Sequence, residues 1–333
     1  MERSLLIDSF LARSGWAGAT RGFLAGDASF RRYERVKIKD KTAILMDAPT
    51  PKEDVRPFIK ITEHLIKLSY SVPHIFAIDI NSGFLLLEDL GNKTFTNALA
   101  AGVDEHWLYQ SAIDVLIDLH GRELSEVVPD NLASYDDEKL LSEVILFVDW
   151  YMAGIFGDPV PDCVKNDFLD IWQELISNTQ IYHETLVLRD FHADNLMWLS
   201  NRDGIRKCGL LDYQDAVRGS PAYDLMSLFE DARRDLKPSL VCDLLDYYFA
   251  AFPELDQNKF NKDYVILSAQ RHCKVIGIFS RLAIRDGKSS YLAHISRCWT
   301  LLDRACCSPE LRILKEWLDE HIPAINRTSH PLD

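Results

Sequence analysis

Basic residues are scarce in this sequence. Its 333 residues include 37 lysines and arginines against 51 aspartates and glutamates, so the formal net charge is −14. A nucleic-acid-binding protein needs a basic surface that neutralises phosphates, and this composition argues against one. The deficit does not exclude a small anionic ligand, because a few local arginines or a metal ion can hold one.

Long apolar runs and paired cysteine motifs are also missing. No stretch of about 18 apolar residues occurs, so the sequence predicts no membrane-spanning helix. The first sixteen residues, MERSLLIDSFLARSGW, have short apolar groups broken by charges and predict an amphipathic helix, not a signal peptide. The seven cysteines are odd in number and no CxxC pair stands near another, which is typical of a reduced, cytoplasmic chain without a zinc site.

The chain is long enough for two packed lobes, and its apolar pattern changes along the way. After the N-terminal helix, residues 1–90 predict mostly strands, with a turn at GDAS (26–29), a hairpin turning at Asn81–Gly83 and a second helix within residues 53–70. From residue 92 the spacing becomes helical, apart from two short strands. We therefore predict an α+β fold with a small sheet-rich lobe, 1–90, and a larger helical lobe, 91–333. The helices expected in the larger lobe span 107–121, 137–156, 222–233, 238–251, 261–285 and 309–320.

The stretch LVLRDFHADNLMWLSNRDGIRKCGLLDYQDA (186–216) has polar residues at the rims of apolar segments. Asp190 precedes Asn195 by five residues, and Asp212 ends the second apolar run. If strands 196–200 and 206–211 pair through the turn NRDG, Asn195 and Asp212 come side by side as oxygen ligands suited to Mg²⁺. Asp190 would orient or deprotonate an attacking hydroxyl, as phosphoryl transfer requires. The alternative is that Asp190 and Asn195 merely cap turns.

Several segments resemble the kinase-like fold in its aminoglycoside phosphotransferase branch. RDFHADN resembles the catalytic loop, LLDYQDA the metal-binding segment, LLLEDLG the adenine-binding hinge, and YDLMSLFEDAR the helix whose Asp224 braces the catalytic loop. Six ordered segments resemble the anomeric sugar kinases of bacterial cell-wall recycling, which phosphorylate N-acetylmuramate and N-acetylglucosamine with ATP and Mg²⁺. These segments are GDASFRRYERV, AILMDAP, LLLEDLG, RDFHADNLMWL, LLDYQDAVRGSPAYDLMSL and QRHCKVIGIFSRL.

The resemblance implies a two-lobed protein-kinase-like fold, with ATP bound by lobe 1–90 and the acceptor by lobe 91–333. It implies an ATP-dependent phosphotransferase acting on the anomeric hydroxyl of an amino sugar, with Asp190 as the catalytic base. Asn195 and Asp212 would be the metal ligands. Glu88 and Leu90 would supply backbone contacts to adenine.

The phosphate-binding lysine of the kinase pattern is missing, because AILMDAP offers Met46 and Asp47 at the expected position. An ATP site needs a cation near the phosphates. Arg31 and Arg32 are the nearest candidates, and as neighbours on a strand only one should point inward. The alternative is that both lie on the surface. Ser29, in the GDAS turn, could offer its backbone amide to a phosphate.

Five further residues are candidates for binding the acceptor. Trp150 and Tyr151 have aromatic faces that suit a sugar, and His192 follows Asp190 by two residues. Arg271 and Lys274, three apart on a helix, could meet the lactyl carboxylate of a muramate. The alternatives are core packing for the two aromatic residues, loop packing for His192 and a solvated charged face for the last pair.

Two other functions stay open at this point. One is a kinase whose acceptor is an aminoglycoside, choline or another amino alcohol. The other is a pseudokinase that binds nucleotide without catalysis, which the missing lysine supports and the set Asp190, Asn195 and Asp212 opposes. We expect ATP and Mg²⁺ as cofactors, a small sugar as substrate, and no nucleic acid or membrane partner. The oligomeric state is left open.

Overall fold

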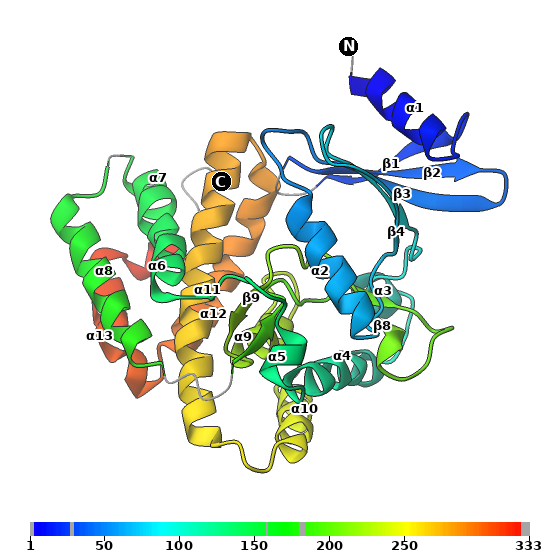
Figure 1. The fold of residues 1–333 in the computed structure, drawn as a ribbon. Helices are drawn as coiled ribbons and strands as arrows, with labels where there is room; N and C mark the ends of the chain where they lie inside the picture. The colour runs from blue at the N-terminus through cyan, green and yellow to red at the C-terminus, as the bar shows by residue number, and fades with distance from the viewer. Residues whose placement is uncertain (1–2, 27–29, 158, 180–183, 328–333) are drawn as a thin grey trace. The chain divides into compact units, whose positions relative to one another are not determined.

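The computed structural model describes residues 3–26, 30–157, 159–179 and 184–327 (Figure 1). The chain forms two compact units. Unit 1 comprises Met1–Val115 and Ala193–Ala216, and unit 2 comprises Leu116–His192 and Val217–Asp333. The segment with Asn195 and Asp212 therefore packs with the N-terminal sheet, while Asp190 belongs to unit 2. The functional lobes expected at 1–90 and 91–333 stay a prediction.

A five-stranded antiparallel sheet forms the framework of unit 1, in the order β1-β2-β3-β5-β4. Successive side chains of a strand point to opposite faces. On one face, helix α1 (Arg3–Arg13) packs Phe10 and Leu11 against Leu45 and Leu86, which confirms the predicted N-terminal helix. The side chains of the opposite face, such as Ile44, line the cavity described below. The strands are β1 (Thr20–Gly26), β2 (Arg32–Ile38), β3 (Lys41–Asp47), β4 (Ile75–Asp79) and β5 (Phe84–Glu88).

Helix α2 (Arg56–Lys67) follows β3 and has a proline in its first turn, where a missing amide proton costs nothing. Its apolar stripe includes Phe58, Ile61 and Leu65, all buried. Tyr213 from the far end of unit 1 stacks on Phe58, with ring centroids 5.3 Å apart, and its hydroxyl lies 2.8 Å from that of Thr62. The segment after β8 (Cys208–Leu210) is thus anchored to α2.

A short hairpin carries the two candidate metal ligands. Strand β7 (Leu196–Trp198) pairs with β8 (Cys208–Leu210), with Leu196 opposite Leu210, so the expected pairing of these strands is confirmed, although both are shorter than expected. The amide of Leu210 donates to the carbonyl of Ser71 at 2.8 Å, which ties the hairpin to the segment before β4. Unit 1 also holds α3 (Phe95–Ala100) and most of α4 (Glu105–His120).

Unit 2 is mainly helical and is arranged around α11 (Gln257–Asp286), a helix of 30 residues (Figure 1). Gly277 lets this helix touch the backbone of Leu146, because a Cβ there would lie 2.3 Å from the Leu146 carbonyl carbon. The predicted helix 137–156 is continuous but contains a π-helical turn at Phe147–Met152. The other α-helices and strands described in this unit are α5 (Leu124–Val127), α6 (Asp137–Leu146), α7 (Ala153–Phe156), α8 (Asp162–Ser177), β6 (Thr185–Val187), β9 (Val217–Gly219), α9 (Ala222–Phe229), α10 (Pro238–Ala251), α12 (Ile295–Ala305) and α13 (Arg312–His321).

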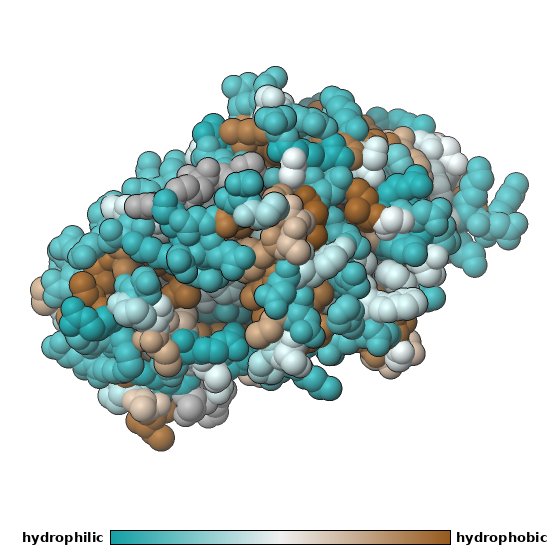
Figure 2. All heavy atoms as spheres, turned by 90° about the horizontal axis from the view of Figure 1, so that it is seen from below, coloured by the Kyte–Doolittle hydropathy of each residue, from teal (hydrophilic) through white to brown (hydrophobic). Residues whose placement is uncertain are grey.

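One face of the molecule can be compared with the hydropathy of its residues. Figure 2 shows a face that is mostly hydrophilic, with hydrophobic residues in separate groups. Within the described ranges, no helix combines the length and the apolar character needed to cross a bilayer.

Candidate active site

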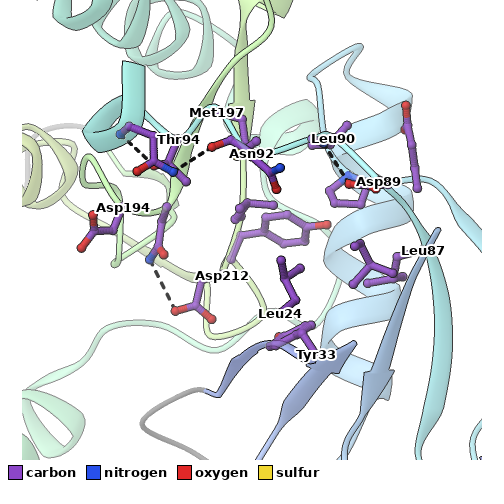
Figure 3. A pocket seen from close by; sticks show the side chains of 18 of the residues that line it. Leu24, Tyr33, Leu87, Asp89, Leu90, Asn92, Thr94, Asp194, Met197 and Asp212 are labelled. Carbon is purple, nitrogen blue, oxygen red and sulfur yellow. Dashed lines mark hydrogen bonds between the residues drawn. The ribbon is translucent and has the colours of Figure 1, made fainter. Parts of the chain in front are cut away.

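A cavity of about 630 Å³ lies in unit 1, between the sheet and the β7–β8 hairpin. This volume is typical of a site for a small organic ligand. In Figure 3, Asp212 and Asp194 lie at one end of the cavity and Asp89 and Leu90 at the other. The apolar lining consists of Leu24, Tyr33, Ile44, Phe58, Pro73, Leu87, Leu90, Met197, Leu211 and Tyr213. The cavity therefore has an apolar wall that suits a flat apolar ligand, and it has polar groups at both ends.

The chain leaves β5 at Glu88 and runs along the cavity to Gly91. Arg35 of β2 holds this segment with two parallel bonds to Asp89, of 2.7 and 2.9 Å. Burial alone would raise the pKa of Asp89, but its bonds to Arg35 and to the amide of Gly91 lower it. The Glu88 carboxylate pairs with Arg202 at 2.9 Å. Glu88 and Leu90 both line the cavity, and their contact with adenine stays a prediction.

The hairpin brings Asn195 and Asp212 together. The amide of Leu211 donates to the Asn195 carbonyl at 2.9 Å, and the Asn195 side-chain amide donates to Asp212 Oδ2 at 3.4 Å. Gln214 Nε2 donates to Asp212 Oδ1 at 2.9 Å. Asp212 has a left-handed backbone with φ of 58°. This conformation costs an aspartate roughly 1 kcal/mol or more and tends to occur where a site needs an exact side-chain direction.

The chemistry of these two side chains fits a magnesium ion, which prefers carboxylate and amide oxygens. In the described part of the chain, no group of three or more histidine, cysteine, aspartate or glutamate side chains is placed to hold a metal. Asp212 and Asn195 alone cannot complete an octahedral shell. The remaining ligands of a magnesium ion would have to be water and nucleotide phosphates, which is its usual coordination in kinases.

Arg31 and Arg32 differ in their surroundings. The Arg31 side chain is 10% exposed, and its Nη2 lies 3.5 Å from Asp212 Oδ1 and its Nε 3.9 Å from Glu53 Oε2. Arg32 begins β2 and is exposed, so Arg31 lies just before the strand and not on it as expected. Of the two candidates, Arg31 is therefore the one directed at the candidate metal ligands. Ser29 lies outside the described residues.

Asp190 belongs to unit 2 and lies in a loop that helix α9 braces. The Asp224 carboxylate accepts the amides of Leu188 and Arg189 at 2.7 and 2.8 Å, and Ser227 Oγ donates to the Arg189 carbonyl at 3.1 Å. Burial raises the pKa of Asp224 to about 7, although the two amides oppose the shift. These contacts fix the backbone immediately before Asp190.

Cations surround the Asp190 carboxylate within unit 2. Arg271 Nη2 lies 3.4 Å from Asp190 Oδ1, and Lys274 Nζ lies 3.2 Å from Glu143 Oε2. Burial alone would raise the pKa of Asp190, but the charges of Arg271, Lys274 and neighbouring groups lower it to about 2. Arg271 and Lys274 are both buried, so the alternative of a solvated charged face is wrong. The Asp190 side chain is 35% exposed and is ionised at neutral pH.

The other acceptor candidates have mixed positions. Tyr151 is fully buried and accepts a hydrogen bond from Trp299 Nε1 at 2.7 Å, so the expectation that it presents a ring face to a sugar is not met. The helical spacing of Tyr151 is that of a residue packed in the hydrophobic core. Trp150 is partly exposed. His192 is buried, and burial lowers its pKa.

Sequence reasoning missed three charged or polar residues beside the candidates. Glu53 pairs with Arg31, while Glu143 and Tyr223 contact Lys274. No sequence pattern indicated these contacts, because each residue is far from its partner along the chain.

The chain has a small antiparallel sheet followed by a mostly helical remainder, and its cavity is bordered by the end of β5 and by Asn195 and Asp212. These features define a two-lobed protein-kinase-like fold. Residues 21–257 match the model of the phosphotransferase enzyme family, and the chain belongs to that family. It is an ATP-dependent small-molecule kinase.

Relatives of known name cover nearly the whole chain. The N-acetylmuramate/N-acetylglucosamine kinase of Caulobacter vibrioides is 34% identical, with 98% of each chain aligned. The protein of the same name from Pseudomonas aeruginosa is 35% identical over 95% of this chain and 93% of its own. Among solved structures, choline kinase LicA from Streptococcus pneumoniae has a TM-score of 0.64 at 13% identity, covering 92% of this chain and 100% of its own. An ADP-bound aminoglycoside phosphotransferase has a TM-score of 0.55 at 16% identity, covering 92% and 99%. These two structures share the fold.

Proposed function

We propose that the protein transfers the γ-phosphoryl group of ATP to the anomeric hydroxyl of an amino sugar, N-acetylmuramate or N-acetylglucosamine. Asp190 is the catalytic base in this proposal, and Asn195 and Asp212 are the metal ligands. The names of the relatives that align over nearly the whole chain support this acceptor.

The observation that carries the proposal is the charge around Asp190. Arg189, Arg271 and Lys274 are set against the carboxylates of Glu143 and Asp190 in one buried network. The Asp224 carboxylate faces backbone amides. In these ion pairs of the described residues, three cations face two carboxylates. A cationic aminoglycoside or choline would therefore meet like charge when its hydroxyl approached Asp190. A neutral N-acetyl sugar or an anionic muramate would not.

Asp190 works as a weak base in this mechanism. The acceptor hydroxyl donates a hydrogen bond to the carboxylate, the bond from its oxygen to the γ-phosphorus forms as the bond to the β-phosphate oxygen breaks, and the proton passes to Asp190. A carboxylate whose pKa is about 2 takes a proton only late in such a step. The anomeric hydroxyl of a sugar is more acidic than an ordinary alcohol, which makes it the better partner for a weak base.

The cavity of unit 1 receives the nucleotide. The apolar wall around Ile44 and Leu87 suits adenine, with the Glu88–Leu90 segment beside it, and the triphosphate extends toward Asp212. A bound magnesium ion would neutralise the phosphates at Asn195 and Asp212. Asp190 precedes Asn195 by five residues, so the chain alone keeps the two within about 18 Å.

The test is a panel of acceptors assayed for ADP release with and without Mg²⁺: N-acetylmuramate, N-acetylglucosamine, glucosamine, kanamycin and choline. We expect magnesium-dependent release with the two N-acetyl sugars. Preferred turnover of kanamycin or choline would contradict the proposal. Nucleotide binding without ADP release for any acceptor would favour the pseudokinase alternative.

A further inference from the structure

The described lining of the cavity has acidic side chains at the end proposed for the triphosphate, and it includes no basic side chain. Among the described residues that line it, none is lysine or arginine, while Asp194 and Asp212 are both present. Met46, at the position of the missing lysine, is buried. A side-chain cation that helps the metal ion to neutralise the phosphates therefore has to lie next to this described lining and not within it.

Arg31 lies next to the lining at this end, and its guanidinium is placed between two acids, Asp212 and Glu53. Its guanidinium lies 3.5 Å from Asp212 and 3.9 Å from Glu53, both longer than the 2.7–3.2 Å of a well-formed hydrogen bond. Its side chain is largely buried, so screening by water is weak. A long arginine side chain between two acids can change its partner by rotation of the stem while the Glu53 contact keeps it nearby.

We propose that Arg31 pairs with Asp212 while the cavity is empty and turns to the nucleotide phosphates when nucleotide binds, which releases the Asp212 carboxylate for the metal. The inference rests on the proposed role of Asp212 as a metal ligand. The same oxygen, Oδ1, faces Arg31 in the structure and is available to a divalent ion only at the cost of repulsion from the guanidinium.

Two consequences follow from this exchange. Arg31 suppresses the binding of a divalent ion to the empty protein, because ion and guanidinium compete for one carboxylate. It also strengthens the binding of nucleotide, because a phosphate replaces Asp212 as its partner. Metal and nucleotide thus bind with positive coupling, and the coupling depends on Arg31.

The experiment measures binding directly. Mn²⁺ titrations followed by electron paramagnetic resonance report the metal alone, and calorimetry reports ADP in the absence of metal. In Arg31→Met we expect Mn²⁺ to bind about three- to fivefold more tightly, as for the loss of one ion pair whose carboxylate partner is partly exposed. ADP should bind about ten- to a hundredfold more weakly, as for a lost hydrogen bond to a charged group.

The matched control is Arg32→Met. It also removes one positive charge, but from the neighbouring arginine, whose side chain is exposed. Neither affinity should change by more than about twofold. Glu53→Gln provides an independent variant that keeps an oxygen for the Phe30 amide. It removes the charge of one of the two acids beside Arg31, so the guanidinium is drawn more strongly to Asp212. Mn²⁺ should therefore bind more weakly than to the wild-type protein, the opposite of Arg31→Met.

The proposal is overturned if Mn²⁺ affinity in Arg31→Met is unchanged or lower, or if Glu53→Gln strengthens it. If Arg31→Met does not fold, the Glu53→Gln result decides alone. Failure of the metal site itself is separate: Asp212→Asn would then leave Mn²⁺ and Mn²⁺–ADP binding intact, whereas a correct site loses both.

Discussion

Arg271 Nη2 lies 3.4 Å from Oδ1 of Asp190. The same guanidinium donates to the Arg189 carbonyl at 3.1 Å and to the Tyr223 hydroxyl at 3.3 Å. Arg271 is thus held on three sides and presents a fixed positive charge to the proposed base. This charge, with those of Lys274 and other nearby groups, favours the ionised carboxylate and lowers the pKa of Asp190 to about 2, although desolvation alone would raise it.

Replacement of Arg271 by methionine should change the pH dependence of turnover. The active form of Asp190 is the carboxylate, so kcat/KM falls as the pH drops through the pKa of Asp190. Because this pKa is lowered, the acid limb of the pH–rate profile lies in strong acid. Without the guanidinium the pKa rises and the acid limb should move toward neutral pH. Arg271→Lys, which keeps the charge, should move it less. An acid limb that stays in place in both variants, in pH–rate profiles, would mean that Arg271 does not set the ionisation.

Replacement of Asp190 by asparagine should lower kcat by on the order of 10²–10⁴. Nucleotide affinity should stay within about twofold, because the carboxylate acts on the acceptor and not on ATP. Steady-state kinetics and calorimetry with ADP measure the two quantities separately. Turnover within a few-fold of the wild-type enzyme would remove Asp190 from the role of base.

Replacement of Asp224 by asparagine should loosen the loop that carries Asp190. The asparagine side chain has one acceptor oxygen, so either Leu188 or Arg189 loses its buried partner. The loss should lower the free energy of unfolding by about 1.5–3 kcal/mol and reduce kcat as well. Ser227→Ala, which removes one neutral bond to the same loop, should cost about 0.5–1.5 kcal/mol. Equal effects of the two variants in denaturant unfolding would argue against a bracing role for Asp224.

Replacement of Tyr151 by phenylalanine separates a core residue from a sugar-binding one. The change leaves the buried indole of Trp299 without its acceptor, which should cost about 1–3 kcal/mol of unfolding free energy. The KM for the sugar should not change. A raised KM with unaltered stability would instead return Tyr151 to the acceptor site.

Much of the fold followed from apolar periodicity and turn chemistry. The β7–β8 hairpin was predictable because two apolar runs flank the polar turn NRDG. Helices α8 and α12 were not assigned, and neither begins with a side-chain cap. The predicted helix 222–233 ends at Phe229 in the structure. The prediction ran four residues too far because the sequence directly after Phe229 has no residue that stops a helix.

The site divides in the same way. Asn195 and Asp212 were paired correctly in space because strand register places them together. The choice between Arg31 and Arg32 needed the structure, since alternation along a strand says that two neighbours differ but not which one points inward. The burial of Arg271 and Lys274 was also beyond the sequence, because α11 is packed on most sides and its charged residues pair with distant ones.

The measurement that tests the central claim most directly is the position of the phosphate in the product. Purified protein, ATP, Mg²⁺ and N-acetylmuramate or N-acetylglucosamine are incubated, and phosphorus nuclear magnetic resonance of the product is recorded with its couplings to the sugar protons and carbons. The account predicts a phosphate coupled to the anomeric proton and carbon, absent when Asp190→Asn replaces the wild-type enzyme. A phosphate on another hydroxyl, or on neither sugar, would contradict it.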